Sequence, residues 1–257
     1  MKATVKIGNK IRKMPGDWNE LSSGFRVFAI RVLLTNDENV AKIIIMRKLL
    51  RIKKSLFTKI NEAQMYDLVQ LLDWLHLQKL TIPIYPELKI KTTIWQKLGI
   101  HKPTLYKCPN DKMENATAYQ YAAASDHYKE YIATHEKKHL DRLLATLYTD
   151  VRDDEEIKKT AKIFKNVPIL VKMSALVYFA GVQYYVYENY KEWLFESDSE
   201  TQGGINFGWW GKYIEIAESG VFGDLDKVYA SRFYDIIVFL IQKKEAYLAQ
   251  KSKMEAK

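Results

Sequence analysis

The chain is poor in cysteine, proline and glycine, the residues that cross-link or bend a polypeptide. Its 257 residues include one cysteine, 6 prolines and 11 glycines, and no proline follows Pro168. A single cysteine, Cys108, excludes an intramolecular disulfide framework and a zinc site built from several cysteines. The low proline and glycine content argues against collagen, low-complexity linkers and turn-rich β-sandwiches. The composition therefore favours helices, and a hydrophobic content of 47% is enough for a buried core.

Long apolar runs are also missing. The most apolar stretch covers residues 167–187, but Lys172 interrupts it and the uncharged part, Met173 to Tyr187, has only 15 residues. A helix that spans a membrane needs about 20. The basic N-terminus is not followed by the apolar segment of a secretory signal. We therefore expect a buried core helix in this stretch, no membrane contact and a cytoplasmic location.

The net charge of +9 is distributed unevenly. Residues 1–107 contain 20 Lys and Arg against 8 Asp and Glu, a net charge of +12, whereas residues 108–257 contain 20 against 23, a net charge of −3. We expect a basic N-terminal part and a C-terminal part with these bounds, packed together as one unit. The densest basic cluster stands near a predicted helix end and comprises Arg47, Lys48, Arg51, Lys53 and Lys54. This cluster suits an acidic protein partner or a nucleic-acid backbone, but Phe57 is the only aromatic residue between Arg47 and Lys59 that could stack on bases.

The hydrophobic pattern predicts a mainly α fold, a multi-helix bundle with a short extended N-terminal arm. Pro83, Pro86, Pro103 and Pro109 forbid a long helix near residues 80–110, so this segment is expected to be extended or a small β-hairpin. Apolar residues elsewhere recur at helical spacing behind Ser, Thr, Asp or Asn caps. We expect seven or eight helices, among them 37–54, 117–148, 168–195 and 207–218, others starting near residues 19, 61, 153 and 224, and a loop at 197–206.

One motif has the form of a metal site. Residues 135–139 read His-Glu-Lys-Lys-His, and on one helix the two histidines of H-E-x-x-H share a face that can bind zinc while the glutamate acts on bound water. Both central positions are lysine here, although they are normally uncharged in the buried helix of zincins. We therefore interpret the segment as the solvated face of a long helix. A zincin-like metallohydrolase that uses His135, Glu136 and His139 remains a remote alternative.

No other motif indicates catalysis or a cofactor. Residues 203–212 are rich in glycine, but Asn206 stands where a P-loop needs its first glycine, and Tyr213 replaces the required Ser or Thr. We expect a non-enzymatic protein without catalytic residues, cofactor or metal ligands. Trp209 and Trp210 join the basic cluster as candidate interaction residues, because tryptophan is over-represented among the anchors of protein interfaces.

Four stretches of the chain resemble one group of phage proteins. They are residues 15–22 (PGDWNELS), 143–148 (LLATLY), 167–181 and the segment from Trp209 to Gly223. Over nearly its whole length the chain resembles proteins from the tail-gene region of Bacteroidetes phages and prophages. The resemblance implies a role in virion morphogenesis, as a tail-assembly chaperone-like factor or a small structural tail component. It carries over no functional residues.

Phage tail assembly through protein–protein contacts is therefore the leading hypothesis. The expected partners are other phage structural or tail proteins, including a tape-measure-like protein whose apolar helix would lie in a helical groove. We expect an oligomer or part of an assembly, located in the host cytoplasm or in the virion. The alternative is a nucleic-acid-binding protein that uses the basic N-terminal half. The uneven charge is expected to be an interaction surface met by acidic protein rather than by DNA.

Overall fold

The computed structural model describes residues 4–7, 10–195 and 208–255. The chain is 66% helical, with 12 α-helices and two small sheets among the described residues, which confirms the mainly α multi-helix fold. The predicted loop at 197–206 lies outside the described residues. The elements are β1 (Thr4–Ile7), β2 (Lys10–Lys13), η1 (Trp18–Glu20), α1 (Ser23–Thr35), α2 (Glu38–Leu49), α3 (Lys54–Phe57), α4 (Glu62–Gln70), η2 (Leu77–Lys79), β3 (Glu87–Ile90), α5 (Ile94–Lys97), β4 (Thr104–Lys107), η3 (Asp111–Met113), α6 (Ala118–Thr134), α7 (Lys137–Tyr148), α8 (Asp154–Phe164), α9 (Ile169–Leu194), α10 (Gly208–Glu218), α11 (Leu225–Ala230) and α12 (Phe233–Glu255).

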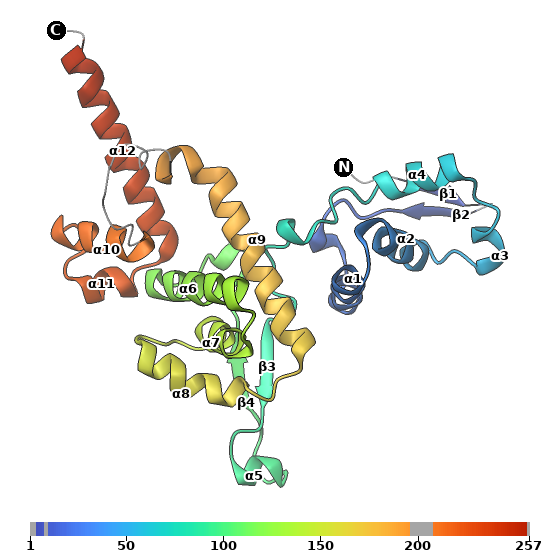
Figure 1. Ribbon diagram of the computed structural model, residues 1–257, viewed down its shortest axis with the longest axis horizontal. Coiled ribbons are helices and arrows are strands. Elements are labelled where there is room, and N and C mark those ends of the chain that lie inside the picture. Colours follow the sequence, from blue (N-terminus) through green and yellow to red (C-terminus); the bar gives the residue numbers. More distant parts are fainter. Residues whose placement is uncertain (1–3, 8–9, 196–207, 256–257) are drawn as a thin grey trace.

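The N-terminal part is built from the β1–β2 hairpin and helices α1 to α4 (Figure 1). Side chains of Ser22 and Asp37 accept hydrogen bonds at the starts of α1 and α2, and Asn61 forms a capping box with Gln64 at the start of α4. Such caps satisfy backbone N–H groups that a helix leaves unpaired. The core of this part contains Trp18, Ile30, Ile45, Met46, Leu72 and Leu75.

The C-terminal part surrounds α9, which runs through the middle of the structure and contacts α6, α7 and α12 (Figure 1). By length and composition α9 is the one described helix that could cross a membrane, but 56% of its apolar window is buried inside the protein. Its buried residues include Tyr178 and Phe179. Several aromatic rings are part of this core, and the rings of Tyr121 and Phe233 stack with their centroids 3.6 Å apart. In this structure α9 therefore packs as a core helix.

Three expected helices are interrupted and the short helix α5 was not expected, which together explain why the described residues form more helices than the hydrophobic pattern predicted. Arg51 and His135 adopt left-handed conformations with φ of 51° and 55°. The first separates α2 from α3 within the expected helix 37–54, and the second separates α6 from α7 within 117–148. The helix capped by Asp224 ends at Ala230 as α11, before α12 begins. Neither Gly, Asn nor Pro stands at the first two breaks, so the usual sequence signals of a helix end are missing there.

The two parts meet where the segment after η2 crosses α9. Leu80 belongs to the N-terminal core, as does Val177 of α9, whereas Tyr178 and Phe179 belong to the C-terminal core. The Leu80 backbone lies so close to Gly181 that an added Cβ would stand 2.0 Å from the Leu80 carbonyl oxygen. The N-terminal core includes Ile84 and the C-terminal core begins with Leu88. The change of core thus precedes the boundary at 107/108 that the charge indicated.

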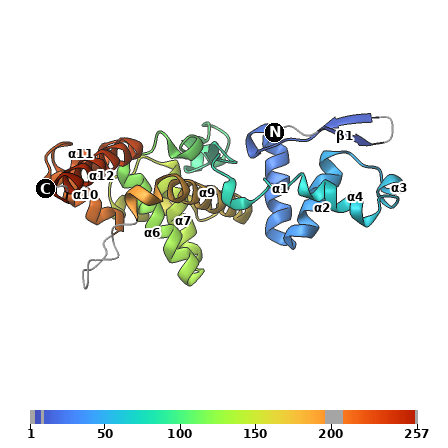
Figure 2. The same ribbon diagram turned by 90° about the horizontal axis from the view of Figure 1, so that it is seen from above.

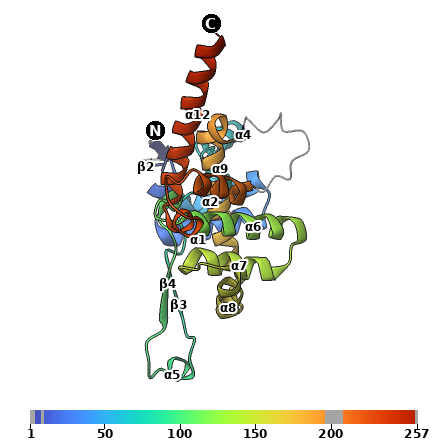
Figure 3. The same cartoon turned by 90° about the vertical axis from the view of Figure 1, so that its left-hand side faces the viewer.

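The molecule is elongated, with α1 to α4 at one end and α10 to α12 at the other (Figure 2). Two elements project from this body (Figure 3). The antiparallel β3–β4 hairpin carries α5 at its tip, and the C-terminal half of α12 extends in the opposite direction. The expected β-hairpin within residues 80–110 is therefore present as β3 and β4.

Candidate interaction surfaces

The basic cluster predicted from sequence lines a groove on the N-terminal part. This basic groove has a volume of about 680 Å³ and is formed by α1, α2 and the segment that leads into α3. Four of the five predicted basic residues line it, and Lys54 lies next to it at the start of α3. The left-handed turn at Arg51 brings residues 51–57 back over α2. The lining residues are Phe28, Ile43, Ile44, Arg47, Lys48, Arg51, Ile52, Lys53 and Phe57.

Two cations of the basic groove lie over its aromatic rings. The Lys48 ammonium is 3.5 Å from the centroid of the Phe28 ring, and the Arg47 guanidinium carbon is 5.3 Å from that of Phe57. Cation–π contacts of this kind hold the charged heads above the rings. The rings are therefore covered by the chain's own cations and do not form an open platform on which bases could stack.

The two tryptophans predicted as interaction residues lie in a different part of the molecule. Trp209 is only 9% exposed and packs against Tyr121 and Phe233. Trp210 is half-buried, and its indole Nε1 donates a hydrogen bond to the Asp126 carboxylate at 2.6 Å. Trp209 therefore belongs to the core and is not an exposed anchor, in contrast to its assignment from sequence. Trp210 connects α10 to α6.

The most exposed apolar cluster stands at the tip of the β3–β4 hairpin (Figure 3). We define the hairpin tip as Ile94, Trp95, Leu98 and Ile100, which are 66%, 54%, 66% and 61% exposed. Exposed Lys91, Lys97 and Lys102 flank these four side chains. A contiguous exposed apolar patch with a charged rim marks a surface that binds a partner.

Local hydrogen bonds, and not a hydrophobic core, hold the hairpin tip in shape. The Gln96 carboxamide accepts hydrogen bonds from the backbone N–H groups of Thr92 and Thr93, at 2.7 and 3.1 Å, and donates one to the Lys102 carbonyl at 2.8 Å. The apolar side chains are thus fixed in position without being buried. Sequence reasoning missed this patch, although the Thr93-x-x-Gln96 capping box was a signal for a short helix between the prolines.

The H-E-x-x-H segment does not have the geometry of a zincin. Because His135 ends α6 in a left-handed conformation and Glu136 caps α7, the two histidines do not lie on successive turns of one helix. The expectation of a solvated face on a continuous helix is wrong for the continuity of the helix and for His139, which is only 5% exposed, whereas residues 135–138 are exposed as expected. His135 is exposed, and the structure does not bring it together with His139 as a ligand pair.

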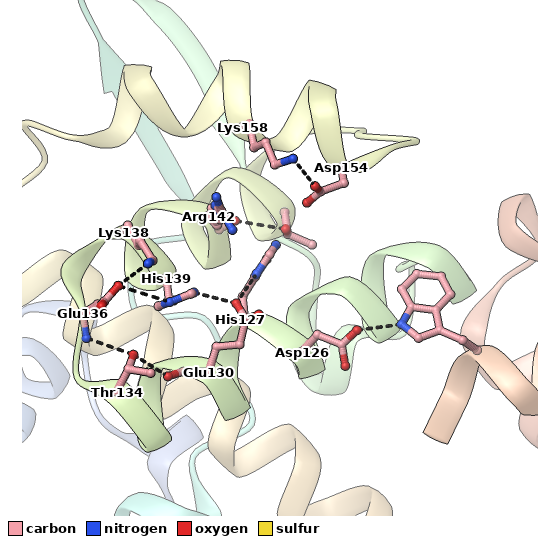
Figure 4. A network of polar contacts seen from close by, with 12 residues as sticks. Asp126, His127, Glu130, Thr134, Glu136, Lys138, His139, Arg142, Asp154 and Lys158 are labelled. Atoms are coloured by element: carbon pink, nitrogen blue, oxygen red, sulfur yellow. Dashed lines mark hydrogen bonds and ion pairs between the residues drawn. The ribbon is translucent and has the colours of Figure 1, made fainter. Parts of the chain in front are cut away.

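His139 instead meets two residues of α6 that no motif had connected with it. A ring nitrogen of His127, a ring nitrogen of His139 and a carboxylate oxygen of Glu130 all lie within 4.8 Å of one another. Figure 4 shows both rings directed toward Glu130 from neighbouring helices. Burial lowers the pKa of His127 from its ordinary value, which the carboxylate of Glu130 partly opposes. His127 is thereby favoured in its neutral form.

Comparison with protein-family models, with curated proteins and with solved structures gives no match to this chain.

Proposed function

We propose that this chain is a non-enzymatic protein of phage tail or virion morphogenesis, which acts through protein–protein contacts as an assembly chaperone or as a structural tail component. The resemblance of its sequence motifs suggests the phage setting. The observation that carries the mode of action is the hairpin tip, which presents four large apolar side chains at the end of a projecting element.

The hairpin tip has the properties of an anchor for a partner's pocket. Tryptophan is among the side chains that contribute most binding energy when they are desolvated at the centre of an interface, and Trp95 is the tryptophan of the tip. The local hydrogen bonds of Gln96 order the tip before it binds, so that little conformational entropy is lost on association. Lys91, Lys97 and Lys102 surround the tip, so the complementary pocket is expected to have an acidic rim.

The basic groove also suits an acidic partner. Its apolar lining includes Phe28, Ile43 and Ile44, and its cations include Arg47 and Lys48. An amphipathic helix with an acidic margin is complementary to this combination, because its apolar face covers the lining and its carboxylates meet the cations. We expect a helix of a tape-measure-like tail protein to occupy the basic groove.

Site-specific photo-crosslinking tests the proposal. A photoreactive amino acid replaces Trp95 in the full chain, which is then expressed in cells that produce the virus particle. The matched control carries the same group at Tyr66, an aromatic residue on α4 that is at least as exposed as Trp95. We expect crosslinks from position 95, but not from position 66, to a tail or virion protein with an acidic helical segment.

Two results would contradict the proposal. Crosslinks from position 95 that are no more frequent than those from position 66 would remove the hairpin tip as a docking site. Binding of the purified chain to duplex DNA with a steep loss of affinity as salt increases would favour the nucleic-acid alternative, because phosphate contacts release counterions. A very long tape-measure gene next to the gene for this chain would independently support the phage setting.

A further inference from the structure

We propose that His127, Glu130 and His139 bind one divalent transition-metal ion between α6 and α7, with Zn²⁺ as the expected metal. The three side chains come from the last turns of α6 and the first turn of α7, on either side of the break at His135 and Glu136 (Figure 4). Their candidate ligand atoms lie within 4.8 Å of one another. This proposal does not depend on the proposed function.

The first argument is that both histidines are buried with a polar atom left over. His127 is 6% exposed and His139 is 5% exposed. Nε2 of His127 and Nδ1 of His139 are each buried without a hydrogen-bond partner. The nitrogen of His127 that faces Glu130 is Nδ1 and not the unpaired Nε2, so of the two unpaired atoms only Nδ1 of His139 is directed toward the carboxylate. Buried polar atoms are nearly always hydrogen-bonded, so this nitrogen needs an explanation. A bound cation supplies one for a nitrogen lone pair.

The second argument is the position of the Glu130 carboxylate. Its Oε2 lies 3.5 Å from Nδ1 of His127 and 2.5 Å from Nδ1 of His139, and the second contact lacks the alignment of a hydrogen bond. A nitrogen lone pair and a carboxylate oxygen repel each other at this separation unless a positive charge is shared between them. One oxygen that faces two imidazoles is the arrangement that a metal ion would complete.

The third argument is the environment of Nε2 of His139, the ring nitrogen that does not face Glu130. The Glu136 carboxylate lies 3.7 Å from Nε2 of His139. A carboxylate there favours the tautomer with its proton on Nε2, which leaves the lone pair of Nδ1 directed toward Glu130. Outer carboxylates of this kind orient metal-binding histidines and increase their basicity. Glu136 is therefore a positioning residue for the proposed site.

The donor set suits zinc or a neighbouring transition metal. Two imidazoles and one carboxylate are common zinc ligands, and three protein ligands leave one coordination position for water. The Glu130 side chain is 49% exposed, so the ion can enter from solvent and the carboxylate can adjust as it binds. A bound ion would fasten α6 to α7 at the point where the expected long helix is broken.

Metal titration of the purified full chain tests the site. The protein is freed of metal with a chelator, and Zn²⁺ is then titrated in competition with a chromophoric chelator. Variants Glu130→Gln and His127→Gln remove one ligand each. His135→Asn is the matched control, because it removes the other histidine of the H-E-x-x-H segment at an exposed position where asparagine tolerates the left-handed backbone.

We expect one Zn²⁺ per wild-type chain and per His135→Asn chain. Loss of a ligand should weaken binding by more than the about 10- to 100-fold that follows from loss of an outer-shell partner. Glu130→Gln changes a half-exposed side chain, and its unchanged circular dichroism would show that the fold is retained. Co²⁺ bound to the wild type should give the intense visible bands of a low-coordinate site, which Glu130→Gln should abolish.

Other results would overturn the proposal. One is the absence of stoichiometric Zn²⁺ binding by the wild type. Another is a Zn²⁺ affinity of folded Glu130→Gln that equals that of the wild type. Loss of binding in His135→Asn alone would assign the metal to the H-E-x-x-H segment and not to this cluster.

Discussion

Gly181→Ala should separate the two parts of the molecule more effectively than any change of similar size. In the structure, the Cβ of this alanine would stand 2.0 Å from the carbonyl oxygen and 2.6 Å from the carbonyl carbon of Leu80. Ordinary contact begins at 3.4 Å, so the Leu80 backbone would have to retreat by the difference of about 1.4 Å. Leu80 is fully buried in the N-terminal core, and its backbone cannot yield as a flexible side-chain end would.

The expected magnitude follows from two opposing terms. Overpacking a close contact costs about 1 to 3 kcal/mol, and a clash with backbone belongs at the upper end of that range. Alanine is favoured over glycine inside a helix by about 1 kcal/mol, which offsets part of the cost. We therefore expect Gly181→Ala to lower the free energy of unfolding by about 2 kcal/mol.

Gly24→Ala is the matched control, since Gly24 also lies in a helix but has no atom within 4 Å of the added Cβ. This control should be neutral or stabilise the protein by up to about 1 kcal/mol. Urea unfolding followed by tryptophan fluorescence and circular dichroism measures both variants. If Gly181→Ala were as stable as Gly24→Ala, the close approach of Leu80 to α9 would not exist in solution.

Three further predictions concern a buried ion pair and buried ionisable side chains. Buried Lys172 connects α7 to α9, because it donates hydrogen bonds to Asp141 and to the Lys165 carbonyl. Lys172→Met should lower the free energy of unfolding in urea by about 3 kcal/mol, because Asp141 loses its partner. Adding Asp141→Leu to the same chain should restore most of that stability. Burial raises the pKa of Cys108 and of Tyr121, Tyr148 and Tyr178 above their ordinary values of 9.0 and 10.0. Above pH 9 the unfolded chain therefore releases protons that the folded chain keeps, so the free energy of unfolding should fall with rising pH, by up to about 1.4 kcal/mol per pH unit for each group; a flat profile between pH 8 and 11 would contradict this reasoning. For the same reason the Cys108 thiol should react with a disulfide reagent only as fast as the protein unfolds, because the thiolate is the reactive form.

Much of the fold was predictable because its signals are local. Asp37, Asn61 and Thr117 are short polar side chains that precede apolar residues at helical spacing, and each of them caps a helix in the structure. The first helix begins at Ser23 behind Ser22, and not near residue 19 as expected. Such a cap satisfies a backbone N–H within three residues, so it can be read from a short window. The start of α9 after Pro168 was predictable for the same reason.

The helix breaks and the candidate sites depended on distant contacts. The side chain of Gln120 near the start of α6 donates to the carbonyls of Thr146 and Leu147 at the end of α7. That contact requires the turn at His135, which no glycine or proline announces. The same turn places His139 beside His127 and Glu130, so sequence spacing alone connected His139 with the wrong histidine.

The hairpin tip and the basic groove belong to different parts of the molecule, so their relative position depends on the joint at Gly181 (Figure 1). A partner that occupies only one of them should bind Gly181→Ala as well as the wild type, since neither surface contains Gly181. A partner that spans both gains an effective concentration from the fixed geometry, and this gain is lost when the two parts move independently. Comparison of Trp95→Ser, Arg47→Glu and Gly181→Ala in partner binding therefore distinguishes one docking surface from two. If Trp95→Ser, Arg47→Glu and Gly181→Ala each weaken binding, a single partner spans both surfaces. If Gly181→Ala binds as well as the wild type, no partner spans both surfaces.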